Sequence, residues 1–171
     1  MTTSIDSTSS LRSIMDDIDL GPTDSIQFAF AKLQLAQAQL CKNSAEQYLE
    51  QIEKIQKEQS EVAEMISRAR ALQSEAEAKD GSTTMPDDMV KYFEAHGLSE
   101  SKKGGGHLHD KDAWTETIKS LTNYQESISN KTQTLMVYLQ DYISQYNSYL
   151  QGASSSVNQA ATTLTAVATG R

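Results

Sequence analysis

Apolar side chains recur at alternating intervals of four and three residues through two long stretches of the chain. The first stretch covers residues 26–76 and the second covers residues 114–153. This spacing places an apolar stripe, called the seam below, along one side of an α-helix, as in a left-handed coiled coil. We therefore predict an all-α fold in which two long coiled-coil helices, over residues 23–79 and 113–171, form an antiparallel hairpin.

The large apolar members of both seams are the candidate residues for helix pairing and for assembly between copies. In the first helix they are Ile26, Phe30, Leu33, Leu40, Tyr48, Ile52, Ile55, Val62 and Ile66. In the second helix they are Trp114, Ile118, Leu121, Ile128, Leu135, Leu139, Tyr142, Tyr146, Tyr149, Val157 and Leu164. Between residues 40 and 52 the intervals are consecutive fours, which adds one residue to the repeat and predicts local unwinding of the supercoil.

The segments outside the two helices have their own signals. Residues 1–22 are rich in Ser, Thr and Asp and lack periodicity apart from a short apolar patch, Leu11, Ile14, Met15, Ile18 and Leu20; we expect a mostly disordered N-terminal arm. Residues 80–112 should contain a short helix that begins near Pro86 and stops at Gly97, followed by a Gly-rich variable loop. Thr23 or Asp24 is the expected cap of the first long helix, and Asp112 that of the second.

The second helix differs from most coiled coils in its surface. Residues 115–171 hold 27 Ser, Thr, Asn or Gln residues but only 6 charged residues. Solvated coiled coils usually carry charges beside the seam, so this surface favours a helix that other helices cover. Phe28 and Leu35 lie off the seam of the first helix, which also indicates more than one neighbour.

Composition narrows the range of partners. The net charge is −8 and there is no basic patch, so binding to nucleic acid is disfavoured. No stretch approaches the roughly 18 apolar residues of a membrane span, and the N-terminus lacks the pattern of a cleaved signal peptide. The single cysteine, Cys41, stands at an apolar position and is best interpreted as a small core residue.

Candidate chemistry is sparse. His107 and His109 lie near Asp110 and Asp112, which are residue types that bind metals. They follow three glycines in an apparently mobile loop, so we predict no metal site. No nucleophile–base arrangement, P-loop or dinucleotide motif occurs. The chain is therefore not expected to be an enzyme or to need a cofactor.

The order of the segments resembles that of a known family. An apolar helix start (residues 25–40) leads into a charged coiled coil, and then come residues 85–98, MPDDMVKYFEAHGL. A Gly-rich loop and a polar C-terminal coiled coil follow. This arrangement resembles the EspA/SseB family of type III secretion translocon filament proteins.

The resemblance implies a function. The chain would be a structural subunit exported through a type III apparatus by an uncleaved signal in residues 1–22. It would polymerise through residues 113–171 into an extracellular filament or needle extension at the bacterial surface, which conducts effectors to the host cell. Its partners would be further copies of itself, needle subunits, pore-forming translocators and, in the cytoplasm before export, a small helical chaperone.

Three other hypotheses about the function are compatible with the sequence. The chain could be a needle-tip protein of the IpaD type, although residues 80–112 are few for the inserted domain of such proteins. It could be a cytoplasmic coiled-coil adaptor or chaperone, against which stands the uncharged surface of residues 115–171. It could also be a metal protein or enzyme that uses His107 and His109, a reading tested by replacing both histidines.

Overall fold

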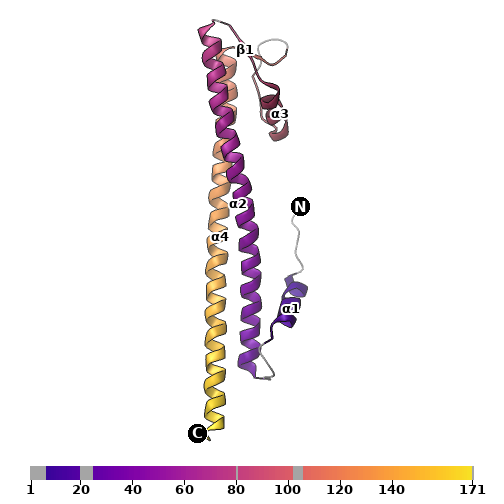
Figure 1. Ribbon diagram of the computed structural model, residues 1–171, viewed down its shortest axis with the longest axis vertical. Helices are drawn as coiled ribbons and strands as arrows, with labels where there is room; N and C mark the ends of the chain where they lie inside the picture. Colours follow the sequence, from indigo (N-terminus) through magenta and orange to yellow (C-terminus); the bar gives the residue numbers. More distant parts are fainter. Residues whose placement is uncertain (1–6, 20–24, 80, 102–105, 171) are drawn as a thin grey trace. The chain divides into compact units, whose positions relative to one another are not determined.

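The computed structural model describes residues 7–19, 25–79, 81–101 and 106–170 of the 171-residue chain. The elements in chain order are α1 (Ser7–Asp17), α2 (Ile26–Ala78), β1 (Thr83–Thr84), α3 (Asp87–His96), β2 (Leu108–His109) and α4 (Lys111–Ala168). The two long helices, α2 and α4, pack against each other as a hairpin, which confirms the predicted all-α fold (Figure 1).

The chain divides into two compact units, and each contains part of both long helices. Unit 1 comprises Met1–Glu50 and Leu135–Arg171, and unit 2 comprises Gln51–Thr134. Unit 1 holds α1 together with the first part of α2 and the last part of α4. Unit 2 holds the rest of both long helices with β1, α3 and β2.

Side-chain hydrogen bonds show the antiparallel register inside each unit. In unit 2, Gln59 donates from Nε2 to Thr132 Oγ1 at 3.3 Å, and Gln73 donates to Thr115 Oγ1 at 2.7 Å. In unit 1, Cys41 Sγ lies 3.8 Å from Gln145 Oε1. Residue numbers therefore rise on α2 as they fall on α4. Polar seam positions thus pair with polar partners, which satisfies their hydrogen bonds.

The caps of the long helices differ from those predicted. Ser25 Oγ accepts a hydrogen bond from the backbone N–H of Phe28 at 3.2 Å, so Ser25 caps α2. Thr23 and Asp24, the expected caps, lie outside the described residues. Asp110 Oδ1 accepts from the N–H of Ala113 at 2.9 Å, so Asp110 rather than Asp112 caps α4. Any short side chain with an oxygen atom can cap a helix. The sequence pattern alone therefore does not decide which of several nearby Ser, Thr or Asp residues is the cap.

The short helix and its glycine stop are confirmed. Pro86 precedes α3 with φ −62°, and Asp87 and Asp88 stand in the first turn. Gly97 has the left-handed φ of +62°, and the N–H of Leu98 bonds the carbonyl of Phe93 at 2.9 Å. A positive φ at this position favours glycine, because a Cβ would clash with the backbone.

Two other expectations were wrong. The N-terminal arm, expected to be disordered, forms α1 over Ser7–Asp17, while residues 1–6 and 20–22 of it lie outside the described residues. The segment 99–112, expected to be a mobile loop, contributes β2, which pairs antiparallel with β1 through Thr83 opposite His109 and Thr84 opposite Leu108. Two-residue strands leave no periodic pattern to detect, and residues 102–105 of the loop are not described.

Candidate self-assembly surface

In unit 2 the seam is closed. Val62, Trp114 and Leu121 are fully buried, and most other predicted seam residues of this unit are less than a tenth exposed. The buried set is Ile52, Ile55, Val62, Ile66, Trp114, Leu121 and Ile128; Ile118 is half-buried. Unit 2 therefore satisfies its seam within one chain, and these residues are not free to bind another copy.

In unit 1 the same seam is open. Of the twelve predicted seam residues that fall in this unit, Leu135 alone is buried. Eight are half-buried: Leu33, Leu40, Tyr48, Leu139, Tyr142, Tyr146, Tyr149 and Val157. Ile26, Phe30 and Leu164 are exposed, Ile26 by 84%. The predicted pairing residues are thus brought to one hairpin, but in unit 1 they remain available for further contacts.

Small residues fill the inner face of unit 1. The buried members are Ala31, Ala36, Ala38 and Cys41 on α2 and Ala153, Ser156 and Ala160 on α4. Cys41 is buried, as expected of a small core residue, and burial together with the charge on Asp141 raises the pKa of its thiol. The signal was present as small residues at intervals of four: 152, 156 and 160.

The small inner face has an energetic consequence. Stabilisation by burial scales with apolar area, at about 25 cal/mol per Å². An alanine buries less area than leucine, so unit 1 gains less from closing its hairpin than unit 2 does. Most large apolar side chains of unit 1 lie at the rim or outside, where they stay accessible.

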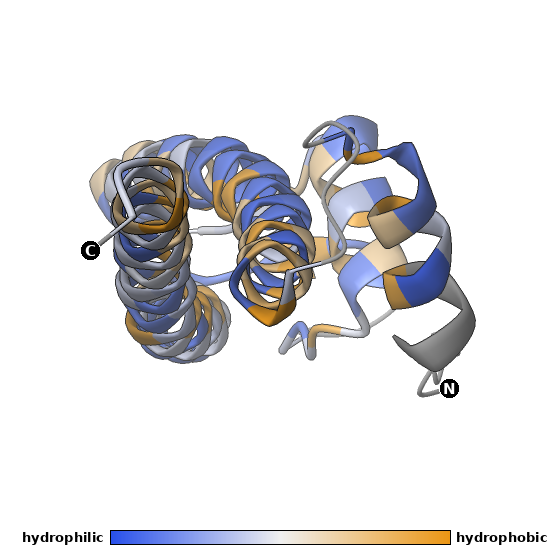
Figure 2. Ribbon diagram, turned by 90° about the horizontal axis from the view of Figure 1, so that it is seen from below, coloured by the Kyte–Doolittle hydropathy of each residue, from blue (hydrophilic) through white to orange (hydrophobic). Residues whose placement is uncertain are grey.

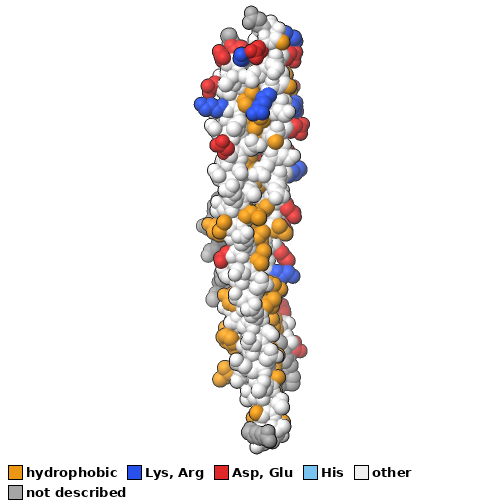
Figure 3. All heavy atoms as spheres, turned by 90° about the vertical axis from the view of Figure 1, so that its left-hand side faces the viewer, with side chains coloured by type: hydrophobic (Ala, Val, Ile, Leu, Met, Phe, Trp, Pro, Cys, Tyr) orange, Lys and Arg blue, Asp and Glu red, His pale blue; other side chains and the backbone are white. Residues whose placement is uncertain are grey.

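Beyond the seam, unit 1 exposes further large apolar side chains. Val137 is 63% exposed and Val167 is 75% exposed. The others on or beside this surface are Leu49, Met136, Tyr138 and Ile143. In Figure 3 hydrophobic side chains gather in a line along the face shown, among uncharged side chains drawn in white. Large exposed apolar side chains in this number are candidates for contact with another molecule.

Tyrosines contribute a stacked group to this surface. The ring of Tyr48 lies 5.6 Å from that of Tyr142, nearly parallel to it, and 5.7 Å from that of Tyr138. Tyr138 is 49% exposed, so one side of the group faces outward. Tyrosine offers a large contact area with a polar tip, and it is common in protein interfaces.

The surface is nearly uncharged on α4. Asp141 is the single charged residue between positions 135 and 168. Figure 2 looks along the long helices and shows many pale positions, of intermediate hydropathy, on α4. Few charges would have to be desolvated when such a helix packs against another protein. We call the exposed and half-buried apolar residues of unit 1 the assembly surface.

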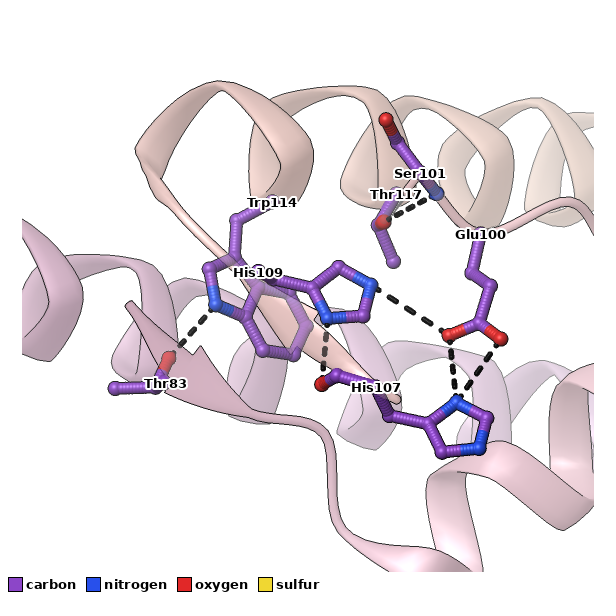
Figure 4. A network of polar contacts seen from close by, with 7 residues as sticks. All are labelled: Thr83, Glu100, Ser101, His107, His109, Trp114 and Thr117. Carbon is purple, nitrogen blue, oxygen red and sulfur yellow. Dashed lines mark hydrogen bonds and ion pairs between the residues drawn. The ribbon is translucent and has the colours of Figure 1, made fainter. Parts of the chain in front are cut away.

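Unit 2 contains a separate polar cluster around the two candidate histidines. His109 is fully buried, its ring stacks on Trp114 at 4.6 Å, and its Nδ1–H donates to the carbonyl of His107 at 2.9 Å. Glu100 accepts from His107 Nδ1 at 3.1 Å and lies 3.6 Å from His109 Nε2 (Figure 4). The histidines were predicted to lie in a mobile loop. Instead, His109 packs β2 against Trp114 at the start of α4, and Glu100 holds His107.

The hydrogen bonds of this cluster connect elements of the fold to one another. Trp114 donates from Nε1 to Thr83 Oγ1 at 2.8 Å (Figure 4). Thr83 in turn donates to the carbonyl of Leu72 at 3.0 Å, so the network joins α2, β1 and α4. Asp110 caps α4. Among the described residues, no group of three or more His, Cys, Asp or Glu side chains is arranged to hold a metal ion.

A second cluster in unit 2 attaches α3 to the hairpin. Tyr92 stacks on His96 at 4.1 Å, and Glu58 lies 3.4 Å from His96 Nε2 and accepts from the hydroxyl of Tyr124. Burial, with the charges of Glu58 and Glu61, raises the pKa of Tyr92 to about 12. Burial and the bond to Glu58 raise the pKa of Tyr124 as well. On the far edge of α3, Arg68 makes a bidentate ion pair with Asp88 at 2.6 and 3.0 Å.

Neither the hydropathy of the helices nor similarity to known proteins assigns a function to this chain. Across the part of the chain that the structure describes, none of the helices is long and apolar enough to cross a membrane. A comparison with protein-family models, with curated proteins and with solved structures found no match to this chain.

Proposed function

We propose that this protein is a structural subunit that self-assembles through the assembly surface of unit 1. The observation that carries the proposal is the contrast within one hairpin: the seam is closed in unit 2 and open in unit 1. A helix pair that leaves its large apolar side chains at the rim is stabilised when a neighbour covers them. The closed unit 2 would hold the hairpin together while unit 1 binds other copies.

The biological setting of the proposal rests on the resemblance of residues 25–171 to type III secretion translocon filament proteins. In that setting the subunit is secreted and polymerises outside the cell into a filament or needle extension that conducts effectors and translocators. Before export a small helical chaperone would cover the assembly surface. The absence of charge from residues 142–168 supports this reading over a solvated cytoplasmic adaptor.

The experiment is a concentration series of the purified chain in sedimentation velocity and electron microscopy. We expect higher oligomers or filaments for the native chain. Val137→Glu, at a residue 63% exposed, should keep the helical circular dichroism spectrum but reduce assembly strongly, because the interface would have to bury a charge. Asn130→Glu, at an exposed polar position of unit 2, is the matched control and should assemble normally.

The outcomes separate the candidate functions. A native chain that stays monomeric at high concentration and binds purified needle subunits would favour the needle-tip reading. A chain that assembles equally well with Val137→Glu and with Asn130→Glu would show that the assembly surface lies elsewhere.

A further inference from the structure

The starting observation is the contact that α1 makes in unit 1. Leu11, Ile14 and Met15 of α1, and Ile18 just after its end, follow the spacing of one helix face, and all four are half-buried. Ile14 and Ile18 line a groove with residues from both long helices: Leu35, Ala38 and Gln39 of α2, and Tyr146 and Leu150 of α4. Figure 1 shows α1 as a separate short helix beside the first part of α2. The apolar face of α1 therefore lies over residues of both long helices, which together form the groove on which it rests.

The fit of α1 in its own chain is loose. None of its apolar residues reaches full burial, and a cleft of about 400 Å³ remains between α1 and the two long helices. An eleven-residue helix is also marginal by itself, so α1 depends on the contact that it makes. The contact is thus weak enough to open.

We propose that, in the assembled protein, α1 of one copy docks in this groove of a second copy. The inference rests on the self-assembly proposed above. The occupant is identified by the structure: the groove is already shaped for Ile14 and Ile18, and an identical helix on another chain makes the same contact. The exposed side of α1 carries Arg12 and Asp16, which stay in solvent in either arrangement.

Exchange of α1 between two copies explains how its weak contact with the groove becomes favourable in an assembly. In a dilute solution the chain's own α1 has the advantage of high effective concentration. When copies approach through the assembly surface, exchange links two hairpins and adds the burial of their exposed apolar side chains. Because each copy donates one α1 and offers one groove, the contact is head-to-tail, and such contacts build open chains unless they close into a ring.

The test uses cysteine pairs in a Cys41→Ala background, which removes the native thiol. One preparation carries Ile14→Cys and the other carries Leu150→Cys, two residues that line the same cleft. The preparations are mixed, allowed to assemble and oxidised. We expect a disulfide-linked dimer of the two variants in the assembled fraction and little in the dilute, monomeric fraction. Ile14→Cys mixed with Asn130→Cys, at an exposed site in unit 2, should give background only.

Each contrary result has a distinct meaning. If a chain carrying both Ile14→Cys and Leu150→Cys forms only intramolecular disulfides within the assembled fraction, exchange is wrong while the proposed function stands. A further mixture combines Leu150→Cys with Leu164→Cys. If these two variants form the disulfide-linked dimer instead, the end of α4 occupies the groove and the exchange of α1 is also wrong. If sedimentation shows no assembly, both proposals are overturned.

A second measurement covers the case in which the cysteine variants fold poorly. The full chain with Ile14→Asp and Ile18→Asp should vacate its own groove, because two charges disfavour the apolar contact. A fluorescent peptide of residues 7–18 should then bind this variant at least tenfold more tightly than the native chain, measured by anisotropy. No binding to the vacated groove would overturn the proposal.

Discussion

Gly152 and Gln34 approach each other so closely that a Cβ on Gly152 would lie 2.8 Å from Gln34 Oε1. The glycine stands inside α4, which continues without interruption to Ala168. The missing side chain therefore serves the close approach of α2 and α4 in unit 1 rather than a break in the helix.

The first prediction follows from this contact. Gly152→Ala adds helix propensity of about 1 kcal/mol, but the new methyl group must displace the amide of Gln34. In a Gln34→Ala background, where that amide is absent, we expect Gly152→Ala to raise the free energy of unfolding by about 1 kcal/mol. In the native background the gain should be smaller or negative. Denaturant unfolding of the native chain, the two single variants and the double variant gives the coupling energy between positions 34 and 152. Equal effects of Gly152→Ala in both backgrounds would contradict the packing described.

The second prediction concerns Thr83, which receives the indole N–H of Trp114 and bonds the carbonyl of Leu72. Thr83→Val leaves both buried groups without this partner, at a cost of about 1–3 kcal/mol. Trp114 is the only tryptophan, so its fluorescence reports this site directly, and we expect a red shift at lower denaturant than in the native chain. Thr83→Ser keeps the hydroxyl and should remain close to native; a large effect of Thr83→Ser would point to the methyl group instead.

The third prediction uses two tyrosines of one cluster as a matched pair. The hydroxyl of Tyr92 is buried without a hydrogen-bond partner among the described residues, whereas that of Tyr124 donates to Glu58. Tyr92→Phe removes an unsatisfied group and should leave stability at neutral pH unchanged or raise it by about 1 kcal/mol. Tyr124→Phe removes a made hydrogen bond to a charged group and should lower stability by about 1.5–3 kcal/mol. The reverse order in thermal unfolding would contradict these assignments.

The same cluster gives an alkaline pH dependence. Burial raises the pKa of Tyr92 to about 12, above the ordinary value of 10, so the folded state favours the neutral phenol. Its contribution is fully present below pH 10 and is lost as the pH rises from 10 toward 12. Tyr92→Phe should therefore lose less stability than the native chain across this range, measured as the shift of the denaturation midpoint. Identical shifts in both chains would show that Tyr92 does not titrate differently on folding.

The sequence predicted the helices well because their signal is periodic. The intervals of Ile52, Ile55, Val62 and Ile66 define one face of a helix, and these residues are buried as that periodicity requires. The same intervals continue through Ile26 and Phe30, which are exposed. Periodicity specifies a face, but how far that face is covered depends on the residues opposite, and in unit 1 these are small.

The sequence did not predict the features whose contacts come from residues distant in the chain. His109 follows three glycines, a local signal of mobility, but its position depends on Trp114 and on the pairing of β2 with β1. The helix α1 was missed because its polar residues resemble those of a disordered arm and its apolar face needs the groove of unit 1. Local composition does not report such partners, and a weak amphipathic face was visible only as Leu11, Ile14, Met15 and Ile18.

The last prediction compares two residues of α4 that stand two positions apart. Leu135 is 8% exposed and faces the inside of the hairpin, while Val137 is 63% exposed and faces away from it. A glutamate at position 135 would be buried without a partner, at a cost of several kcal/mol. Leu135→Glu should therefore lower the thermal midpoint and the helical signal of the monomer, so that assembly is lost as a consequence of unfolding. Val137→Glu should lose assembly with the thermal midpoint of the monomer unchanged.

Circular dichroism in dilute solution and sedimentation at high concentration separate the two effects, because the first reports the hairpin and the second reports the contact between copies. Leu135→Gln is the control for charge, since it places a polar group of similar size at the same inner position and should be destabilised less than the glutamate variant. If Leu135→Glu folded normally and still assembled, the inner face of unit 1 would not be the hairpin contact. If Val137→Glu unfolded the monomer, the surface assigned to assembly would instead belong to the fold.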